Sequence, residues 1–297
     1  MTFIDQLQTH FPELDILKNE PMAKHTSFRI GGPVCMIFPK TCDSLVQVYR
    51  FCLSHGEAPR ILGAGTNILA PDNGMEQLVI CTRDLAQVRL LRENTLEAEC
   101  GVLLSKAACF ARDHSLSGME FAAGIPGTIG GAVYMNAGAY GGEMRQIVER
   151  TLALLPDGSL LDVEGDAHEF SYRHSVFEAK NALILKTQLR LLPANKIDIT
   201  EKMRELAQKR RSSQPLDMPS AGSTFKRPVG GYAAALIDAA GLKGKGIGGA
   251  AVSEKHAGFV VNLGNATARD VLATMEYIQK KVYESSGVAL EPEVRIW

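Results

Sequence analysis

One stretch of the chain, GMEFAAGIPGTIGGAVYMNAGAYGGE at 118–143, combines many glycines with apolar side chains. Its glycines alternate with Ala, Ile, Val, Met and Tyr, so the stretch is not a polar flexible linker. Glycine permits positive φ and close backbone approach, and successive N–H groups can then converge on an anionic group such as a pyrophosphate. The competing interpretation is a run of tight turns between buried strands.

A second glycine loop, GAGTN at 63–67, follows an apolar run that is typical of a strand. The dinucleotide pattern G-x-G-x-x-G fails at Ile68, and the Gly-Lys pair at 244–245 is followed by glycine, which excludes a Walker P-loop. Two loops that offer backbone N–H groups to one long anionic cofactor therefore remain. The predicted cofactor-binding residues in them are Gly63, Ala64, Gly65, Thr66, Asn67, Gly124, Ile125, Pro126, Gly127, Thr128, Gly130 and Gly131.

The cysteines and histidines indicate neither a metal nor a redox site. The six cysteines, at 35, 42, 52, 81, 100 and 109, show no C-x-x-C spacing, so we expect them to be reduced and to act as small apolar side chains. His25, His174 and His256 lack a ligand spacing such as H-x-x-x-H, and no bound metal is expected.

Apolar periodicity predicts the elements that position the glycine loops. A short helix is expected over about 3–9, an amphipathic helix from Ser44 to a stop at Gly56, and a further helix from Ser105 to near Gly118. Strands are expected within 58–69, 78–81, 95–100 and 182–192. Two apolar runs around Asp157-Gly158 predict a β-hairpin.

The second part of the chain begins after a predicted boundary near residue 194. Asp198 with Glu201 predicts a capping box for a helix that ends at about residue 211. A last helix is expected between a cap at Thr267, with Asp270, and a stop at Gly287, followed by a final strand, EVRIW. Because helices and strands mix without regular βαβ alternation, the predicted fold class is α+β in two parts.

Composition narrows the function classes. The 297 residues are 45% hydrophobic and 22% charged, as in a soluble globular protein, and the net charge of -1 argues against a general nucleic-acid partner. No apolar run approaches the roughly 20 residues that span a bilayer. The first residues, MTFIDQLQTHF, lack the basic region and apolar core of a signal peptide, so a cytoplasmic protein without a membrane partner is expected.

Seven motifs follow one another along the chain: KHTSFRIGGP (24–33), ILGAGTNIL (61–69), the glycine-rich stretch at 118–143, FSYRHSVF (170–177), PSAGSTFKRP (219–228), GLKGKGIGGAAVSEKHAGFVVN (241–262) and LEPEVRIW (290–297). Each motif alone is weakly specific. Their joint order and spacing closely resemble the UDP-N-acetylenolpyruvoylglucosamine reductases (the MurB family) of peptidoglycan synthesis. The resemblance covers essentially the whole chain.

The resemblance implies a particular α+β architecture and chemistry. A PCMH-type FAD-binding domain, like that of vanillyl-alcohol-oxidase-type flavoproteins, is expected over 1–194, with subdomains of about 1–82 and 83–194. A C-terminal α+β lobe that binds the substrate is expected over 195–297. The resemblance also implies noncovalent FAD, NADPH as cosubstrate, and reduction of UDP-N-acetylglucosamine enolpyruvate, a nucleotide sugar, to UDP-N-acetylmuramate by a monomeric enzyme.

The implied reaction needs charge stabilisation and a proton donor. Hydride delivery to the terminal carbon of the enolpyruvyl group pushes electrons into the carboxylate and gives an enediolate. Arg173 in YRHS matches the position that stabilises this charge, and its planar fork suits a carboxylate. Ser223 in AGSTF matches the proton donor, and Glu293 in EPEV matches the third catalytic position, which stabilises the enediolate with Arg173.

Each of these residues also has a structural interpretation. Arginine in a loop is typical of a surface, serine after glycine is typical of a turn or N-cap, and Glu293 would be a solvated carboxylate near a strand end. Glu291 lies two residues from Glu293 and therefore on the same face of the expected strand, so the choice between them depends on the motif.

Basic residues near the serine are predicted to bind the substrate. Lys226 and Arg227 can hold its diphosphate through charge-assisted hydrogen bonds. Arg210 matches a family position close to the flavin, whereas Lys209 and Arg211 are as well explained by the dipole at a solvated helix C-terminus. Tyr140 in AGAYG either lines the substrate site or belongs to the core.

The chain also departs from the family pattern. Relatives often carry Lys where this chain has Ser213, so another residue would have to make the phosphate contact expected of that lysine. The interval from Tyr172 to Pro193 has no room for the inserted tyrosine-bearing loop of longer reductases, so the chain resembles the shorter, loop-lacking type.

Two other functions stay open from the residues. One is an oxidase or dehydrogenase on the same flavin scaffold that acts on a sugar or hydroxy acid, and the other is a flavin-binding or nucleotide-sugar-binding protein without catalysis. The joint presence of Arg173, Ser223 and Glu293 in their motifs favours the reductase.

Overall fold

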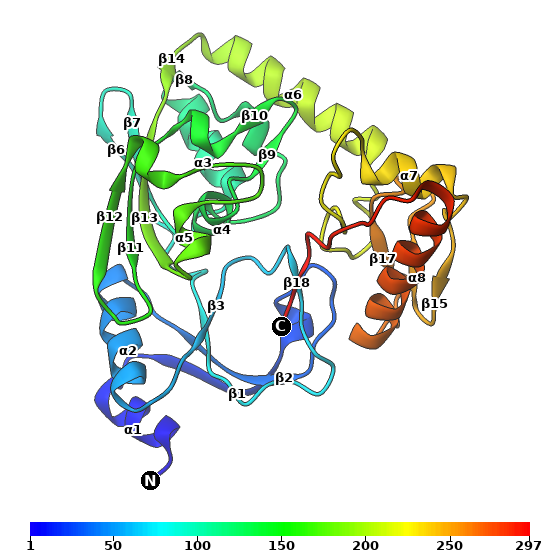
Figure 1. Cartoon of the computed structure of the whole chain (residues 1–297). Helices are drawn as coiled ribbons and strands as arrows, with labels where there is room; N and C mark the ends of the chain where they lie inside the picture. Colours follow the sequence, from blue (N-terminus) through cyan, green and yellow to red (C-terminus); the bar gives the residue numbers. More distant parts are fainter. The chain divides into compact units, whose positions relative to one another are not determined.

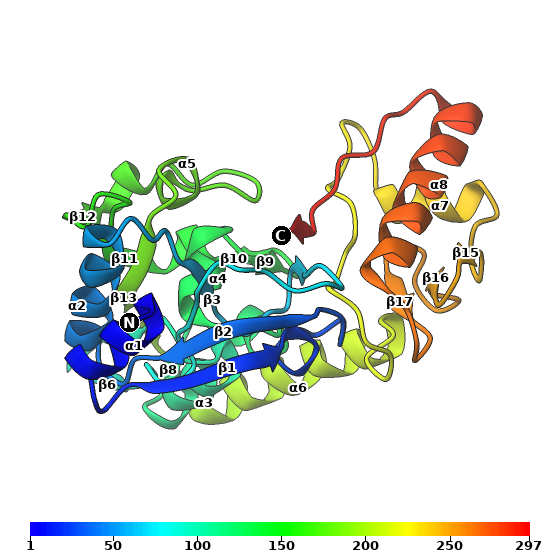
Figure 2. The same ribbon diagram turned by 90° about the horizontal axis from the view of Figure 1, so that it is seen from below.

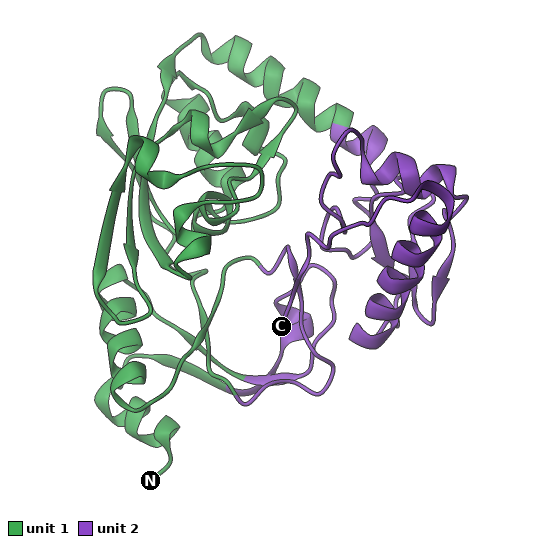
Figure 3. Cartoon of the chain, viewed as in Figure 1, with its two compact units in different colours: residues 1–17, 35–64, 77–209 green, residues 18–34, 65–76, 210–297 purple.

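A computed structural model describes residues 1–297 and divides the chain into two compact units (Figures 1 and 3). Unit 1 comprises residues 1–17, 35–64 and 77–209, and unit 2 comprises residues 18–34, 65–76 and 210–297. The units therefore alternate along the sequence, whereas the predicted functional domains, 1–194 and 195–297, meet at a single boundary. Those domain limits stay a prediction.

Unit 1 contains an antiparallel five-stranded sheet in the order β12-β11-β13-β7-β6, seen at the left of Figure 1. Its strands are β6 (Val88–Arg92), β7 (Thr95–Glu99), β11 (Val148–Leu154), β12 (Leu160–Glu164) and β13 (Leu183–Arg190). The hairpin predicted at Asp157-Gly158 is confirmed, because β11 and β12 pair with Leu154 opposite Leu160. The sequence analysis did not predict β6.

A second sheet has the order β1-β2-β5-β3. It contains β1 (Asp15–Pro21), β2 (Pro33–Phe38), β3 (Arg60–Leu62) and β5 (Val79–Cys81), and both β2 and β3 run parallel to β5. The helices α1 (Phe3–His10) and α2 (Cys42–Ser54) accompany it, as predicted. Helix α2 begins two residues early because Thr41 Oγ1 accepts a hydrogen bond from the Ser44 N–H, and its predicted apolar face is buried.

Shorter elements of unit 1 surround the glycine-rich stretch. They are α3 (Leu104–Asp113), β8 (Leu116–Ser117), α4 (Ile129–Tyr134), β9 (Gly138–Ala139), β10 (Gly142–Glu143), α5 (Val176–Ala179) and β14 (Leu192–Pro193). The prediction that α3 reaches Gly118 is wrong: the helix ends at Asp113 because the following residues form β8, which pairs with β14. Helix α4 packs against β13 and β7.

Helix α6 (Lys196–Ser213) is the long helix near the top of Figure 1, and the division between the units falls within its last turn. The predicted capping box at Asp198 is wrong, because the helix begins two residues earlier and Asp198 lies in its first turn. Instead, Asn195 Oδ1 accepts from the Ile197 N–H at 2.8 Å. None of the helices combines the length and the apolar character that a bilayer crossing requires.

Unit 2 contains a small antiparallel sheet with helix α8 (Ala268–Ser286) packed on it (Figure 2). The strands are β15 (Gly246–Ile247), β16 (Ala250–Val252) and β17 (Val260–Asn262), and α7 (Ala233–Ala239) packs against α8. The predicted ends of α8 are confirmed: Thr267 and Asp270 form a capping box, and Gly287 closes the helix with φ 70°.

The last strand is shorter than predicted. Only Arg295–Ile296 forms β18, which runs parallel to β4 (Ile68–Leu69) within unit 2. Glu291 and Glu293 precede this strand and flank Pro292, which forms an isolated antiparallel bridge with Phe225. That the two glutamates share one face stays a prediction. Glu291 is exposed, whereas Glu293 is half-buried.

Candidate active site

The two predicted glycine loops meet within unit 1. A Cβ atom on Gly63 would lie only 2.7 Å from Thr128 Oγ1, so glycine is required at 63 by close approach. Thr128 is buried and is the N-cap of α4, where its Oγ1 accepts a hydrogen bond from the Gly131 N–H at 3.3 Å. The structure therefore brings together the first residues of loop 63–67 and the loop at 124–131.

Several backbone N–H groups of these loops are open to a ligand. Those of Ile125, Ile129 and Gly130 donate to backbone carbonyl oxygens of the protein. The structure gives no protein acceptor for the N–H groups of Gly63, Ala64, Gly124, Gly127 and Thr128. Backbone donors that converge without protein acceptors are suited to the oxygens of a phosphate group.

Gly130 and Gly131 are neighbours in α4 but have different surroundings. A Cβ atom on Gly130 would lie 2.8 Å from Cys100 Cβ, so this glycine is required by packing inside unit 1. Gly131 is exposed, and a Cβ atom there would meet nothing closer than Thr128 Oγ1 at 3.7 Å. Neither residue has positive φ. The surface at Gly131 is therefore open to an external ligand, whereas Gly130 has an internal reason to be glycine.

The remainder of the first loop, residues 65–67, belongs to unit 2. Gly65 has φ 62° and lies against the His25 carbonyl oxygen, so no other residue fits there. Its own carbonyl accepts from the Ser27 N–H at 3.0 Å. The motif KHTSFRIGGP thus supports this part of the loop.

Ser223 and Glu293 are neighbours within unit 2, where both flank the buried Thr224. The Glu293 N–H donates to the Thr224 carbonyl at 2.8 Å, and Thr224 Oγ1 accepts from the Val260 N–H at 2.9 Å. The Ser223 side chain is exposed and its hydroxyl has no hydrogen-bond partner in the protein. Asn67 adds a further tether, because its Nδ2 donates to the Glu293 carbonyl at 3.1 Å.

Arg173 lies in unit 1, in a two-residue turn between Ser171 and His174. It has φ 56°, a left-handed conformation that is uncommon for a residue with a side chain. Its guanidinium carbon lies 5.1 Å from the centre of the Tyr172 ring. The side chain of Arg173 is half-buried. Arg173 is therefore not the fully exposed residue that the structural interpretation of an arginine in a loop assumes.

The predicted substrate-binding residues are spread over both units. Tyr140 has φ 54° at the tip of the β9–β10 hairpin in unit 1 and is 45% exposed, which excludes the alternative of a core tyrosine. In unit 2, Lys226 Nζ lies 3.4 Å from Glu291 Oε2, and the Arg227 guanidinium stacks on the Tyr232 ring at 4.5 Å. Glu291 is therefore engaged by a lysine that was predicted to bind substrate.

The basic residues at the end of α6 lie in different environments. Arg210 is half-buried and is the first residue of the last segment of unit 2, whereas Lys209 is exposed and pairs with Glu205 at 2.6 Å. The carbonyl of Arg211 accepts from Lys255 Nζ at 2.6 Å. The exposed Ser213 ends the helix. These environments favour Arg210 over Lys209 as a ligand-binding residue.

The thiols of Cys42, Cys52 and Cys100 are poor nucleophiles. Burial raises the pKa of Cys42 to about 12 and that of Cys52 to about 12, and it also raises the pKa of the fully buried Cys100. No group of three or more His, Cys, Asp or Glu residues is placed to hold a metal ion.

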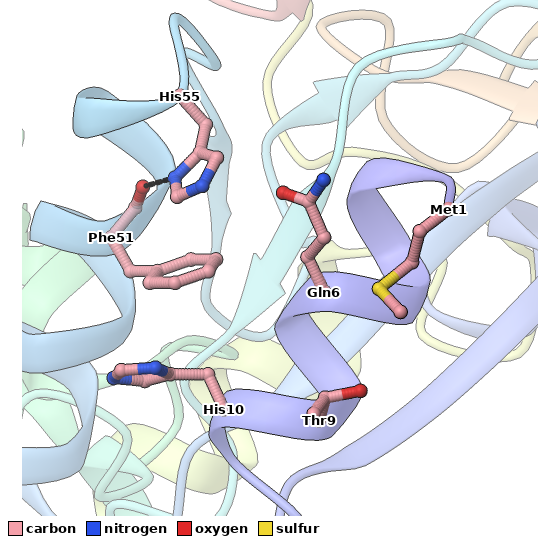
Figure 4. A pocket seen from close by; sticks show the side chains of 6 residues that line it. All are labelled: Met1, Gln6, Thr9, His10, Phe51 and His55. Carbon is pink, nitrogen blue, oxygen red and sulfur yellow. Dashed lines mark hydrogen bonds between the residues drawn. The ribbon is translucent and has the colours of Figure 1, made fainter.

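A shallow pocket of about 320 Å³ lies elsewhere on unit 1, between α1 and α2 (Figure 4). Met1, Gln6, Thr9, His10, Phe51 and His55 line it. The Phe51 ring lies between the two imidazoles, at 4.8 Å from His10 and 4.2 Å from His55. None of the predicted site residues is present there.

The sequence analysis missed a residue beside the turn of Arg173 and a residue that anchors helix α8. Asn136, itself in the glycine-rich stretch, is buried, donates to the Ser171 carbonyl at the start of the turn of Arg173 and accepts from the Arg145 N–H. Asp72 accepts hydrogen bonds from the Ala268 and Arg269 N–H groups at 2.8 and 3.3 Å, and so holds the start of α8. The only sequence signal for Asn136 was an asparagine among small residues, because asparagine tolerates the positive φ that is common in turns.

Comparison with known proteins places two stretches of the chain in family models. Residues 33–164 match an FAD binding domain, and residues 214–297 match the UDP-N-acetylenolpyruvoylglucosamine reductase C-terminal domain. The UDP-N-acetylenolpyruvoylglucosamine reductase of Caldanaerobacter subterraneus subsp. tengcongensis is 46% identical, over 99% of this chain and 97% of the relative. That of Syntrophomonas wolfei subsp. wolfei is 41% identical, over 94% of this chain and 93% of the relative.

A solved structure shows the same arrangement of elements. The UDP-N-acetylenolpyruvylglucosamine reductase (MurB) of Thermus caldophilus superimposes with a TM-score of 0.82 at 32% identity. The match covers 96% of this chain and 99% of that chain.

Proposed function

The chain belongs to the UDP-N-acetylenolpyruvoylglucosamine reductase family, and we infer from this membership that it is an FAD-dependent oxidoreductase of peptidoglycan synthesis. The predicted fold class is confirmed, because an FAD-binding domain and the reductase C-terminal domain are both matched. We propose NADPH as the hydride source and UDP-N-acetylglucosamine enolpyruvate as the substrate, with UDP-N-acetylmuramate as the product.

The residues of unit 1 fit a flavin with a pyrophosphate. Loops 63–64 and 124–128 provide five N–H groups without protein acceptors, and the surface at Gly131 has no side chain to obstruct a ligand. No His or Cys falls at a recognisable attachment motif, so we propose noncovalent FAD. The bound cofactor would supply hydride transfer between NADPH and the enolpyruvyl group. Residues 65–67, 130 and Arg210 complete the proposed cofactor-binding set.

Arg173 is proposed to stabilise the negative charge that develops on the substrate carboxylate. Its guanidinium stays charged and offers a planar pair of donors, and one well-placed donor to a developing oxyanion is worth about 3 kcal/mol. The left-handed backbone supports this role, since strained residues concentrate at functional sites.

Ser223 is proposed to donate the proton to the second carbon of the enolpyruvyl group. A hydroxyl is a weak acid, and it serves here because the enediolate is far more basic than a carboxylate. The single observation that carries this assignment is that the Ser223 hydroxyl is exposed, has no protein partner, and is separated from Glu293 only by the Thr224 backbone. Glu293 is proposed to stabilise the enediolate together with Arg173.

Lys226, Arg227 and Tyr140 are proposed to bind the nucleotide part of the substrate. Lys226 would exchange its ion pair with Glu291 for a phosphate oxygen, a small loss because an exposed pair contributes about 0–1 kcal/mol. We also propose that the enzyme is a monomer and acts in the cytoplasm, where NADPH and nucleotide sugars are available. Light scattering during gel filtration tests the monomer.

The function is tested by incubating the purified protein with NADPH and the enolpyruvyl nucleotide in deuterated water. We expect stoichiometric NADPH oxidation and a product in which one deuterium from solvent occupies the second carbon, because the proton added there comes from a group that exchanges with solvent. NADPH oxidation that requires oxygen and leaves the nucleotide unchanged would instead indicate an oxidase on the same scaffold. Nucleotide binding without any NADPH oxidation would indicate a binding protein.

A further inference from the structure

Asn136 lies at the centre of a hydrogen-bond network in unit 1 beside the turn that carries Arg173. It is 1% exposed and has φ 42°. Its Nδ2 donates to the Ser171 carbonyl at 3.0 Å and to Glu143 Oε2 at 3.1 Å, and its Oδ1 accepts from the Arg145 N–H at 3.0 Å. Both donors and the acceptor of the carboxamide are therefore used in a buried position.

The turn itself is short and contains only Tyr172 and Arg173 between Ser171 and His174. Ser171 and His174 exchange two long backbone hydrogen bonds of 3.2 Å, and Arg173 between them has a disfavoured backbone conformation. A strained residue persists only where its surroundings hold it. Asn136 binds the carbonyl at the start of the turn, and Ser175 Oγ donates to the Tyr134 carbonyl at 2.7 Å just after its end.

Asparagine is the residue type that this place requires. A left-handed backbone favours Gly, Asn or Asp, and the two donor contacts require an amide N–H₂. Aspartate would place a carboxylate against the Ser171 carbonyl and Glu143, with nothing to donate. Glycine would keep the backbone conformation but would leave the Ser171 carbonyl without its donor.

We propose that Asn136 is a positioning residue that fixes the turn at 171–174 and thereby directs the Arg173 guanidinium toward the substrate carboxylate. The inference depends on the function proposed above for Arg173. Asn136 itself touches no reacting atom, so its effect is confined to the step in which Arg173 acts. Reoxidation of the reduced flavin by the enolpyruvyl nucleotide should depend on Asn136, whereas reduction of the flavin by NADPH should not.

The test is Asn136→Gly in the FAD-loaded enzyme, with Asn181→Gly as the matched control. Asn181 has a similar φ of 48° in the same unit, but it is exposed and its side chain makes no hydrogen bond. Because glycine accepts positive φ, both variants avoid backbone strain and only Asn136→Gly loses a network. We expect Asn136→Gly to slow reoxidation by about tenfold or more, with flavin reduction and FAD content near parental. Asn181→Gly should match the parent in both steps.

A double-mutant cycle with Arg173→Ala separates positioning from a general structural role. If Asn136 acts through Arg173, the double variant reoxidises no more slowly than Arg173→Ala alone. A further slowing that equals the effect of Asn136→Gly by itself would overturn the proposal. If Asn136→Gly loses FAD, Asn136→Asp replaces it in the cycle, because it keeps the side-chain size and the acceptor for Arg145 but removes the donor to Ser171.

The outcomes also distinguish this proposal from the proposed function. If the parent enzyme is not reoxidised by the enolpyruvyl nucleotide, the proposed function fails before any variant is considered. If Arg173→Ala reoxidises at the parental rate, the role of Arg173 fails, and the positioning role fails with it. If Arg173→Ala is slow while Asn136→Gly and Asn136→Asp are both parental, only the inference about Asn136 is overturned.

Discussion

Replacing Gly130 or its neighbour Gly131 in α4 by alanine adds one methyl group in each case, but the two substitutions should affect different properties of the protein. At Gly130 the new Cβ would lie 2.8 Å from Cys100 Cβ and 3.1 Å from the Cys100 carbonyl oxygen, both inside unit 1. At Gly131 it would lie on the exposed side of the helix, 3.7 Å from its nearest neighbour, Thr128 Oγ1. We therefore expect Gly130→Ala to damage the fold and Gly131→Ala to damage FAD binding.

The magnitudes follow from these distances. Overpacking costs about 1–3 kcal/mol, and each kcal/mol lowers Tm by about 2–4 °C for a domain of roughly 150–250 residues. Alanine regains at least about 0.5 kcal/mol of this cost through its higher helix propensity, so Gly130→Ala should lower the apoprotein Tm by roughly 1–10 °C. Gly131→Ala should leave it unchanged or raise it, because alanine is favoured over glycine in a helix by about 0.5–1 kcal/mol. The same overpacking cost against a bound flavin at Gly131 would raise the Kd for FAD by about 5- to 150-fold.

Thermal melting of the apoproteins and titration of each with FAD check both expectations. Parental FAD affinity in Gly131→Ala would refute close approach of the flavin at this surface. A parental Tm in Gly130→Ala would refute the claim that packing against Cys100 requires glycine. A substitution at Gly130 alone would be uninformative, since lost folding and lost flavin contacts both lower FAD content.

Arg173→Lys should slow flavin reoxidation by about two to three orders of magnitude, because an ammonium cannot reproduce the planar fork; near-parental turnover would remove Arg173 from the mechanism. Ser223→Ala should slow the same step by about 10²-fold or more, while NADPH still reduces the flavin at close to the parental rate; equal loss of both steps with loss of FAD would make Ser223 structural. His168 is fully buried, with its ring nitrogens 2.8 Å from the Gly165 carbonyl and 3.0 Å from Thr151 Oγ1, and burial holds its pKa below 6.5. Since the unfolded imidazole takes up a proton that the buried one resists, the free energy of unfolding should fall as pH drops below 6.5, and urea titrations of His168→Gln should show a weaker fall.

Local signals in the sequence predicted some elements well. The ends of α8 were found because a capping box at Thr267 and a glycine at 287 are determined by neighbouring residues. The same pattern at Asp198 was misleading, because Asn195 supplies the cap to a helix that begins earlier. Local capping residues compete, and the sequence pattern alone does not rank them.

Contacts between distant residues were not predictable. The motifs indicated two glycine loops, yet the approach of Gly63 to Thr128 depends on packing across 65 residues of chain. Likewise, the Asn67 side chain reaches the Glu293 carbonyl from the other end of the sequence. The EVRIW segment was predicted to be one strand, but only Arg295–Ile296 forms a strand, which pairs with β4. Site residues were predicted from a family pattern, and the tertiary contacts that hold them required the structure.

Anaerobic stopped-flow measurement of the flavin absorbance tests the central claim most directly. The FAD-loaded protein is first mixed with NADPH and then, once reduced, with the enolpyruvyl nucleotide. We predict that NADPH bleaches the flavin and that the nucleotide restores its absorbance without oxygen, in proportion to the UDP-N-acetylmuramate formed. A reduced flavin that stays bleached with the nucleotide and recovers only when oxygen is admitted would contradict the claim that this chain is an enolpyruvyl reductase.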